Sequence, residues 1–211
     1  MKTSQKSLPQ SGLTEAGLCG IRFRDRSFAA RISIVQPRHT GKNMFFQELT
    51  VENSHTLNTS LYARYMELAG TDRIRQTHHF AGRFENTYIE AADIPDITSV
   101  LTLVKQQAGR SLGLAVETLK AGFWFNAMGP GHRTTPHHHD ENDELLSAVY
   151  YIRVPENSGD LILHTAGNSI SIRPQEGKLV LFAPAIVHEV TTNLSAELRL
   201  SVAMNIGPVD R

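Results

Sequence analysis

The chain has 211 residues, 40% hydrophobic and 20% charged, which is enough apolar material to bury a normal core. Basic and acidic residues number 21 each, and this balance argues against a nucleic-acid-binding surface. The single cysteine, Cys19, excludes a disulfide framework and a cysteine-based zinc site. No apolar run has the length of a membrane span, and MKTSQKSLPQ lacks a signal-peptide core, so we expect a cytoplasmic protein away from membranes. A homodimer is the commonest assembly at this size.

The first 115 residues predict strands and two helices. Residues 21–35 are typical of one or two strands. A helix over 58–69 is expected to end at Gly70 and to share one apolar face among Leu61, Tyr65, Leu68 and Ala69. A second helix is expected to start at Pro95 or Asp96 and to end at Gly109. Its apolar residues recur with helical spacing at Ile97, Val100, Leu101, Val104 and Ala108.

After residue 115 the pattern changes to short strands separated by turns. The strand-like segments are LKAGFWFN, ELLSAVYYIRV, GDLILHT, NSISIRP, GKLVLFAP, AIVHEVT and ELRLSVAMN. Seven close strands with no helices between them favour a sandwich or jelly roll. We therefore expect a single domain over 1–211 in the α+β class, mainly β, in which 1–115 cover a core at 116–206.

The segment PHHHDEND, residues 136–143, gathers side chains that bind metals. Because residues i and i+2 of a strand share a face, the run offers two pairs of ligands. One pair is His138 with Asp140, and the other is His137 with His139. About 50 residues later His188 lies in an apolar stretch and could supply a third ligand. Two histidines and a carboxylate form the facial triad of non-haem Fe(II) sites.

The segment AELRLSVAMN places an arginine on a strand between apolar neighbours. Alternation puts Arg199 and Ser201 on one face, and the apolar residues Leu198, Leu200, Val202 and Met204 on the other. A buried guanidinium needs an anionic partner. That partner is either a protein carboxylate or the carboxylate of a bound ligand, which arginine binds in bidentate fashion and which Ser201 would assist.

Together these motifs resemble those of the 2-oxoglutarate/Fe(II)-dependent oxygenases, whose core is a double-stranded β-helix. The family signature is H-x-D, a distant histidine, and R-x-S about ten residues further on. Here it corresponds to His138 and Asp140, then His188, then Arg199 and Ser201. SAVYYIRVPENSGDLIL and GKLVLFAPAIVHEVTTN resemble the segments around these residues in the family. The likeness covers about residues 122–206.

The resemblance implies an enzyme, a hydroxylase that couples O2 and 2-oxoglutarate decarboxylation to oxidation of a small-molecule or peptide substrate. It implies that Fe(II) binds His138, Asp140 and His188. The far carboxylate of 2-oxoglutarate would pair with Arg199 and Ser201. Tyr151 resembles the tyrosine that assists this carboxylate in some members, although a core tyrosine fits that position as well. Asn126 is a further, weaker pocket residue.

Other interpretations of the same residues remain open. His137, His139 and Glu144 also resemble the first metal-binding motif of the cupins, which share the β-helix and would add His188. A cupin-type isomerase or dioxygenase would need no 2-oxoglutarate, and a non-enzymatic metal- or sugar-binding β-domain would pair Arg199 with a structural carboxylate. We prefer the pair with Asp140 because a carboxylate is the usual facial-triad ligand.

Two features before the β region have no assigned role. His78 and His79 are expected at the surface or on the substrate side, and residues 83–89 are either a substrate-facing strand or part of the cover.

Overall fold

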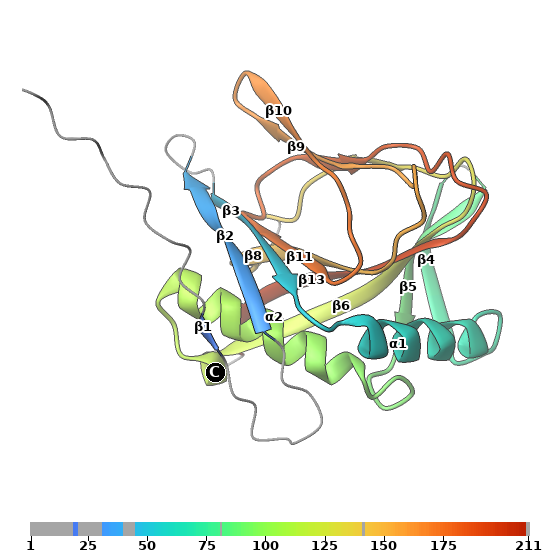
Figure 1. The fold of residues 1–211 in the computed structure, drawn as a ribbon, viewed down its shortest axis with the longest axis horizontal. Coiled ribbons are helices and arrows are strands. Elements are labelled where there is room, and N and C mark those ends of the chain that lie inside the picture. The colour runs from blue at the N-terminus through green and yellow to red at the C-terminus, as the bar shows by residue number, and fades with distance from the viewer. Residues whose placement is uncertain (1–18, 21–30, 40–44, 81, 141, 210–211) are drawn as a thin grey trace, which may run out of the picture.

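The computed structural model describes residues 19–20, 31–39, 45–80, 82–140 and 142–209. Their strands form two sheets, and two helices cover the larger sheet on the face away from the smaller one (Figure 1). All the strand pairs are antiparallel. The predicted fold class, mainly β with a helical cover in a double-stranded β-helix, is confirmed.

The large sheet contains nine of the described strands, in the order β1-β2-β3-β11-β8-β13-β6-β5-β4. In chain order their bounds are Cys19–Gly20 for β1, Arg31–His39 for β2, Phe45–Val51 for β3, Ile74–Phe80 for β4, Arg83–Ile89 for β5, Leu119–Met128 for β6, Leu146–Arg153 for β8, Lys178–Phe182 for β11 and Arg199–Pro208 for β13. The long strands β6, β8 and β13 lie at its centre, so they form the floor on which a site can be built.

The small sheet contains four of the described strands, in the order β10-β9-β12-β7. Their bounds are Thr134–His137 for β7, Leu161–Thr165 for β9, Asn168–Ile172 for β10 and His188–Val190 for β12. Apolar side chains from both sheets, which include Tyr151, Leu163 and Phe182, pack into one cluster between them.

The helices are α1, His55–Leu68, and α2, Ile97–Leu112, and a short 3-10 helix, Val116–Thr118, precedes β6. Their apolar faces pack against the large sheet in a second cluster, which includes Leu61, Tyr65, Ile97, Val104, Val202 and Met204. Asn58 of α1 ties the helix to the sheet, because its side chain accepts a 2.7 Å hydrogen bond from the hydroxyl of Tyr150. No helix of the described residues is both long and apolar enough to span a membrane.

Both predicted helices are present with different bounds: the first begins at His55 and ends at Leu68, and the second is longer than expected. It continues past Gly109 to Leu112 and ends at Gly113, which has the left-handed φ of 69° typical of a helix C-terminus. Gly109 lies inside the helix and does not end it. A Cβ at this position would lie 2.8 Å from the carbonyl oxygen of Leu114, so the glycine allows the chain after the helix to approach the helix closely. Ala69, placed on the apolar face, is exposed instead.

All seven strands predicted after residue 115 are present as β6, β8, β9, β10, β11, β12 and β13. Four of the described strands, β1, β3, β4 and β7, were not predicted. Residues 83–89 form β5 and belong to the sheet. Of the strand region expected at 21–35, residues 21–30 lie outside the described part of the chain, and 31–35 belong to β2.

Candidate active site

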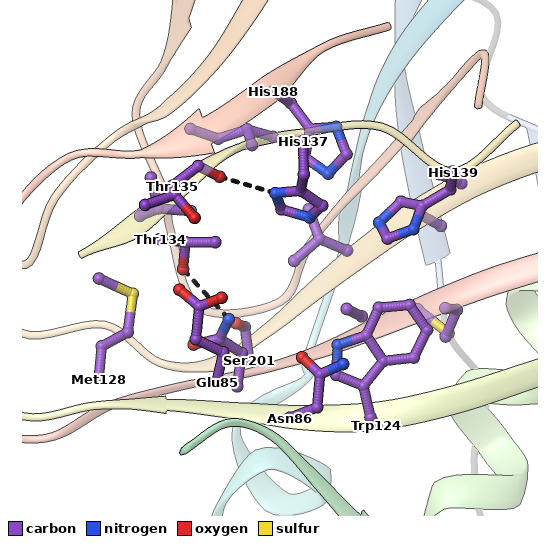
Figure 2. A pocket seen from close by; sticks show the side chains of 18 of the residues that line it. Glu85, Asn86, Trp124, Met128, Thr134, Thr135, His137, His139, His188 and Ser201 are labelled. Carbon is purple, nitrogen blue, oxygen red and sulfur yellow. Dashed lines mark hydrogen bonds between the residues drawn. The ribbon is translucent and has the colours of Figure 1, made fainter. Parts of the chain in front are cut away.

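A cavity of about 380 Å³ opens between the two sheets. The small sheet contributes His137 and His188, and the large sheet contributes Trp124, Tyr151 and Arg199. Figure 2 shows the three labelled histidines on one wall, facing Glu85, Asn86 and Trp124 on the other. This volume accommodates a small molecule or a single side chain.

Three histidines converge in this cavity. The ligand nitrogens of His137, His139 and His188 all lie within 4.8 Å of one another. The register of the small sheet explains this, because β7 pairs with β12 so that His137 lies directly opposite His188. The strand β7 ends at His137, and two residues later the backbone N–H of His139 donates to the carbonyl of Pro184 at 2.9 Å. The ring of His139 thereby joins those of His137 and His188.

Hydrogen bonds determine which nitrogen of two rings is available. Nδ1 of His137 lies 2.7 Å from the carbonyl oxygen of Thr135, and Nδ1 of His188 lies 2.9 Å from that of Ile186. Because a carbonyl only accepts hydrogen bonds, Nδ1 carries the proton in both rings and Nε2 keeps its lone pair. A backbone carbonyl on the outer nitrogen is the usual support of a metal-binding imidazole.

Two rings of the cluster, His139 and His188, have lowered pKa values. Burial, the larger cause, and the neighbouring ring of His137 together lower the pKa of His188 to about 3 and that of His139 to about 4. Neutral imidazole is the form that coordinates a metal. The donor set therefore fits a divalent transition metal such as Fe(II).

The preferred pair from the sequence, His138 and Asp140, is not the pair that the structure gathers with His188. Nδ1 of His138 instead lies 2.5 Å from a carboxylate oxygen of Asp140, and each side chain is 46% exposed. His138 also contributes to the cavity lining. The alternative pair, His137 and His139, is the one that meets His188. Glu144, the fourth cupin ligand, lies outside this cluster and accepts hydrogen bonds from Asn142.

Arg199 reaches the cavity from β13 and is only 1% exposed. Its Nη1 donates to the carbonyl oxygens of Ser158, at 3.1 Å, and Gly159, at 2.6 Å, while its Nε has no hydrogen-bond partner. Burial lowers its pKa. Arg199 forms no ion pair with a carboxylate of the described residues. Its buried charge therefore lacks the anionic partner that the sequence analysis expected.

Tyr151 lies beside Arg199, whose guanidinium carbon is 5.2 Å from the centre of the tyrosine ring. The side chain is fully buried, and its hydroxyl has no hydrogen-bond partner among the described residues. Burial raises the pKa of this phenol to about 12, so the hydroxyl keeps its proton and can donate. Tyr151 and Arg199 both line the cavity, and each has a buried donor atom without a partner in the described residues, so together they suit the carboxylate of a ligand.

Ser201 and Asn126 are neighbours across β13 and β6, and both line the cavity. Ser201 is 5% exposed. The amide of Asn126 is already engaged, since it donates to the Thr134 hydroxyl at 3.3 Å and accepts from Arg83 at 3.2 Å. Asn126 therefore helps to hold β5, β6 and β7 together at the cavity.

Several cavity residues had no individual role assigned from the sequence. Trp124 of β6 was not singled out, whereas Glu85 and Asn86 lie on β5, the strand for which a substrate-facing position was one of two expectations, and His78 of β4 was expected at the surface or on the substrate side. His78 has a φ of +58°, which is uncommon for a residue other than glycine, and its ring Nδ1 lies 3.2 Å from the amide nitrogen of Asn86. The segment 83–89 was recognised as strand-like, but no motif marked its polar residues.

The chain was compared with models of protein families, with curated proteins and with solved structures. Residues 123–207 match the model of the 2OG-Fe(II) oxygenase superfamily. No curated protein matches the chain in sequence.

Three solved structures share the fold. A prolyl hydroxylase from Trichoplax adhaerens, solved with a hypoxia inducible factor peptide fragment, is 15% identical, with a TM-score of 0.62 over 77% of this chain and 83% of its own. A prolyl-4-hydroxylase from Pseudomonas putida is 20% identical, with a TM-score of 0.60 over 77% and 92%. A non-heme alpha ketoglutarate dependent carbocyclase from nogalamycin biosynthesis is 15% identical, with a TM-score of 0.64 over 78% and 80%. Residues 123–207 of this chain are thus similar to the 2OG-Fe(II) oxygenase superfamily, and the fold is the one that these solved structures share.

Proposed function

We propose that the protein is a non-haem Fe(II) oxygenase, a hydroxylase that uses 2-oxoglutarate, in which His137, His139 and His188 hold the metal. The observation that carries the proposal is the combination of a three-histidine cluster and an arginine without an anionic partner in one cavity. Fe(II) chelated by 2-oxoglutarate would activate O2 and couple decarboxylation to succinate and CO2 with oxidation of a substrate C–H bond.

The chain's own residues have distinct roles in this scheme. Thr135 and Ile186 orient two of the imidazoles through their carbonyls. The far carboxylate of 2-oxoglutarate is bound by Arg199 through its positive charge and by Tyr151 through its phenol proton, and Ser201 assists. The apolar cluster around Leu163 and Phe182 excludes water from this end of the cavity.

Two features weigh against the cupin alternative. The metal set that it requires includes Glu144, which is not part of the cluster. It also gives no role to Arg199, which is buried without a carboxylate partner.

We further propose a cytoplasmic protein that acts on a small-molecule or peptide substrate, does not bind nucleic acid and forms a homodimer. The balance of 21 basic and 21 acidic residues supports the absence of a nucleic-acid partner. The cavity volume supports a small molecule or one inserted side chain.

The test is succinate formation from 2-oxoglutarate in air, with and without Fe(II). We expect Fe(II)-dependent turnover that Arg199→Ala abolishes. Arg153→Ala is the matched control, because Arg153 lies on the exterior and pairs with Glu176 and Glu197. Iron binding without any succinate from the wild-type protein would contradict the proposal.

A further inference from the structure

Glu85 is the acidic side chain in the lining of the cavity, and the proposed mechanism gives it no role. It comes from β5, outside the residues that match the superfamily. Figure 2 shows it on the wall that faces the three histidines, near Ser201 and Thr134. Its side chain is 14% exposed, so it is largely removed from bulk water.

The carboxylate of Glu85 is incompletely satisfied. Its Oε1 is buried and has no hydrogen-bond partner among the described residues. The facing cation is Arg83, whose Nη2 lies 3.6 Å from Oε1, an ion-pair distance but too long for a hydrogen bond. A buried acceptor without a donor costs about 1–3 kcal/mol, and more when the acceptor is charged.

Arg83 does not supply the missing donor: its two terminal nitrogens are engaged elsewhere, and its Nε forms no hydrogen bond with the described residues. Nη2 donates to the carbonyl of Arg133 at 3.0 Å and to the Thr134 hydroxyl at 3.1 Å. Nη1 donates to Asn126 and to two backbone carbonyls. Arg83 therefore holds β5, β6 and β7 together, and Glu85, a lining residue of the cavity, retains an unused acceptor.

The neighbouring residues also suit a donor ligand. The amide nitrogen of Asn86 contacts His78 and the hydroxyl of Tyr88, while its amide oxygen accepts no hydrogen bond from the described residues. Trp124 presents a half-buried indole on the same wall. Acceptor oxygens beside an indole ring form an environment that favours a cationic nitrogen through charge-assisted hydrogen bonds and cation–π attraction.

We propose that Glu85 determines substrate specificity by accepting hydrogen bonds from a cationic nitrogen of the substrate, an ammonium or a guanidinium group. The inference rests on the proposed function and adds the substrate class to it. A cation that contacts Glu85 from the cavity lies closer to this carboxylate than to Arg83 behind it, so attraction exceeds repulsion. The metal centre would not repel this cation, because the two negative charges of bound 2-oxoglutarate offset the two positive charges of Fe(II).

The probes are n-butylguanidinium and n-butylurea, which have nearly the same shape and differ in charge. Each is titrated calorimetrically, without O2, into protein loaded with Fe(II) and 2-oxoglutarate. We expect the wild-type protein to bind the guanidinium at least about ten-fold more tightly than the urea. Glu85→Gln should abolish this preference. Glu90→Gln, an exposed residue just after β5, is the matched control and should preserve it.

Equal affinities for the two probes in the wild-type protein would overturn the inference, as would a preference that survives Glu85→Gln. The wild-type comparison decides the question even if Glu85→Gln fails to fold after Arg83 loses its counter-ion. The visible charge-transfer band of the Fe(II)–2-oxoglutarate chelate is recorded on the same samples. Its presence with equal affinities would refute the role of Glu85 alone, and its absence would refute the proposed function.

A second pair of probes distinguishes two sources of the cationic group. A blocked Gly-Arg-Gly tripeptide is compared with its citrulline counterpart in the same titration. Tighter binding of the arginine tripeptide than of n-butylguanidinium would assign the group to a peptide side chain. The reverse order would assign it to a free small molecule.

Discussion

Replacement of Tyr151 by phenylalanine should change stability and cosubstrate affinity in opposite directions. The hydroxyl is fully buried and has no partner in the described structure, so in the metal-free protein its removal relieves an unsatisfied donor. We expect the free energy of unfolding to rise by about 1 kcal/mol, the lower end of the cost of an unpaired buried polar group, because a small void offsets the rest.

The same substitution should weaken 2-oxoglutarate binding. A hydrogen bond to a charged acceptor contributes about 1.5–3 kcal/mol, which corresponds to a loss of affinity of about 10- to 100-fold. Urea unfolding of the metal-free protein measures the first effect, and anaerobic titration of the Fe(II)-loaded protein with 2-oxoglutarate measures the second. A destabilised variant with unchanged affinity would refute the assignment and make Tyr151 an ordinary core residue.

Tyr150→Phe is the matched control for this experiment. Tyr150 points to the helical side of the sheet, where its hydroxyl donates to Asn58 at 2.7 Å. Its removal leaves that amide oxygen without its donor, so we expect a loss of about 1 kcal/mol of stability. Because this face lies away from the cavity, the affinity for 2-oxoglutarate should not change.

Two further predictions concern stability. In the metal-free protein the pKa of His188 is held near 3, below its usual 6.5, so its contribution is complete above about pH 6.5 and is lost as the pH falls toward 3. Urea unfolding should therefore show a free energy of unfolding that falls between pH 6 and pH 4 more steeply in the wild type than in His188→Leu. The difference between the two slopes should be about 1.4 kcal/mol per pH unit, and equal slopes would contradict this. Gly159→Ala should cost about 3 kcal/mol or more in the same assay, because φ is +92° and the new Cβ would lie 2.2 Å from the carbonyl oxygen of Thr191. Gly167→Ala, with a similar φ of +91° and no atom within 4 Å, should cost only about 1 kcal/mol, and equal losses would show that the close contact is relieved.

The strand alternation around Arg199 was predictable from sequence because it depends only on local period. Leu200, Val202 and Met204 pack toward the helices, and Arg199 and Ser201 line the cavity, as the pattern indicated. A period of two is imposed by the backbone itself, so a charged residue among apolar neighbours reveals which face carries the site.

The orientation of the histidine run was not predictable in the same way. Three consecutive histidines satisfy both parities of a strand, and a shift of one residue exchanges inward and outward side chains. The pairing of β7 with β12 sets the parity, and that contact joins His137 to a residue about 50 positions away. The strand β7 is only four residues long, too short for local periodicity to identify.

Glu85 illustrates a third limit. A single glutamate in a short strand has no motif, and on an exterior face it would be an ordinary solvated charge. Its significance comes from burial, from the engagement of Arg83 elsewhere and from the cavity that it lines. These are tertiary properties and leave no periodic signal in the sequence.

The identity of the metal ligands is the central claim, and one measurement tests it most directly. Fe(II) and 2-oxoglutarate are added without O2 to the metal-free wild-type, His139→Ala and Asp140→Ala proteins, and the visible charge-transfer band of the chelate is recorded. The three-histidine site predicts a band in the wild type and in Asp140→Ala that is weakened or lost in His139→Ala. A band that persists in His139→Ala and disappears in Asp140→Ala would contradict the account and assign the metal to His138 and Asp140.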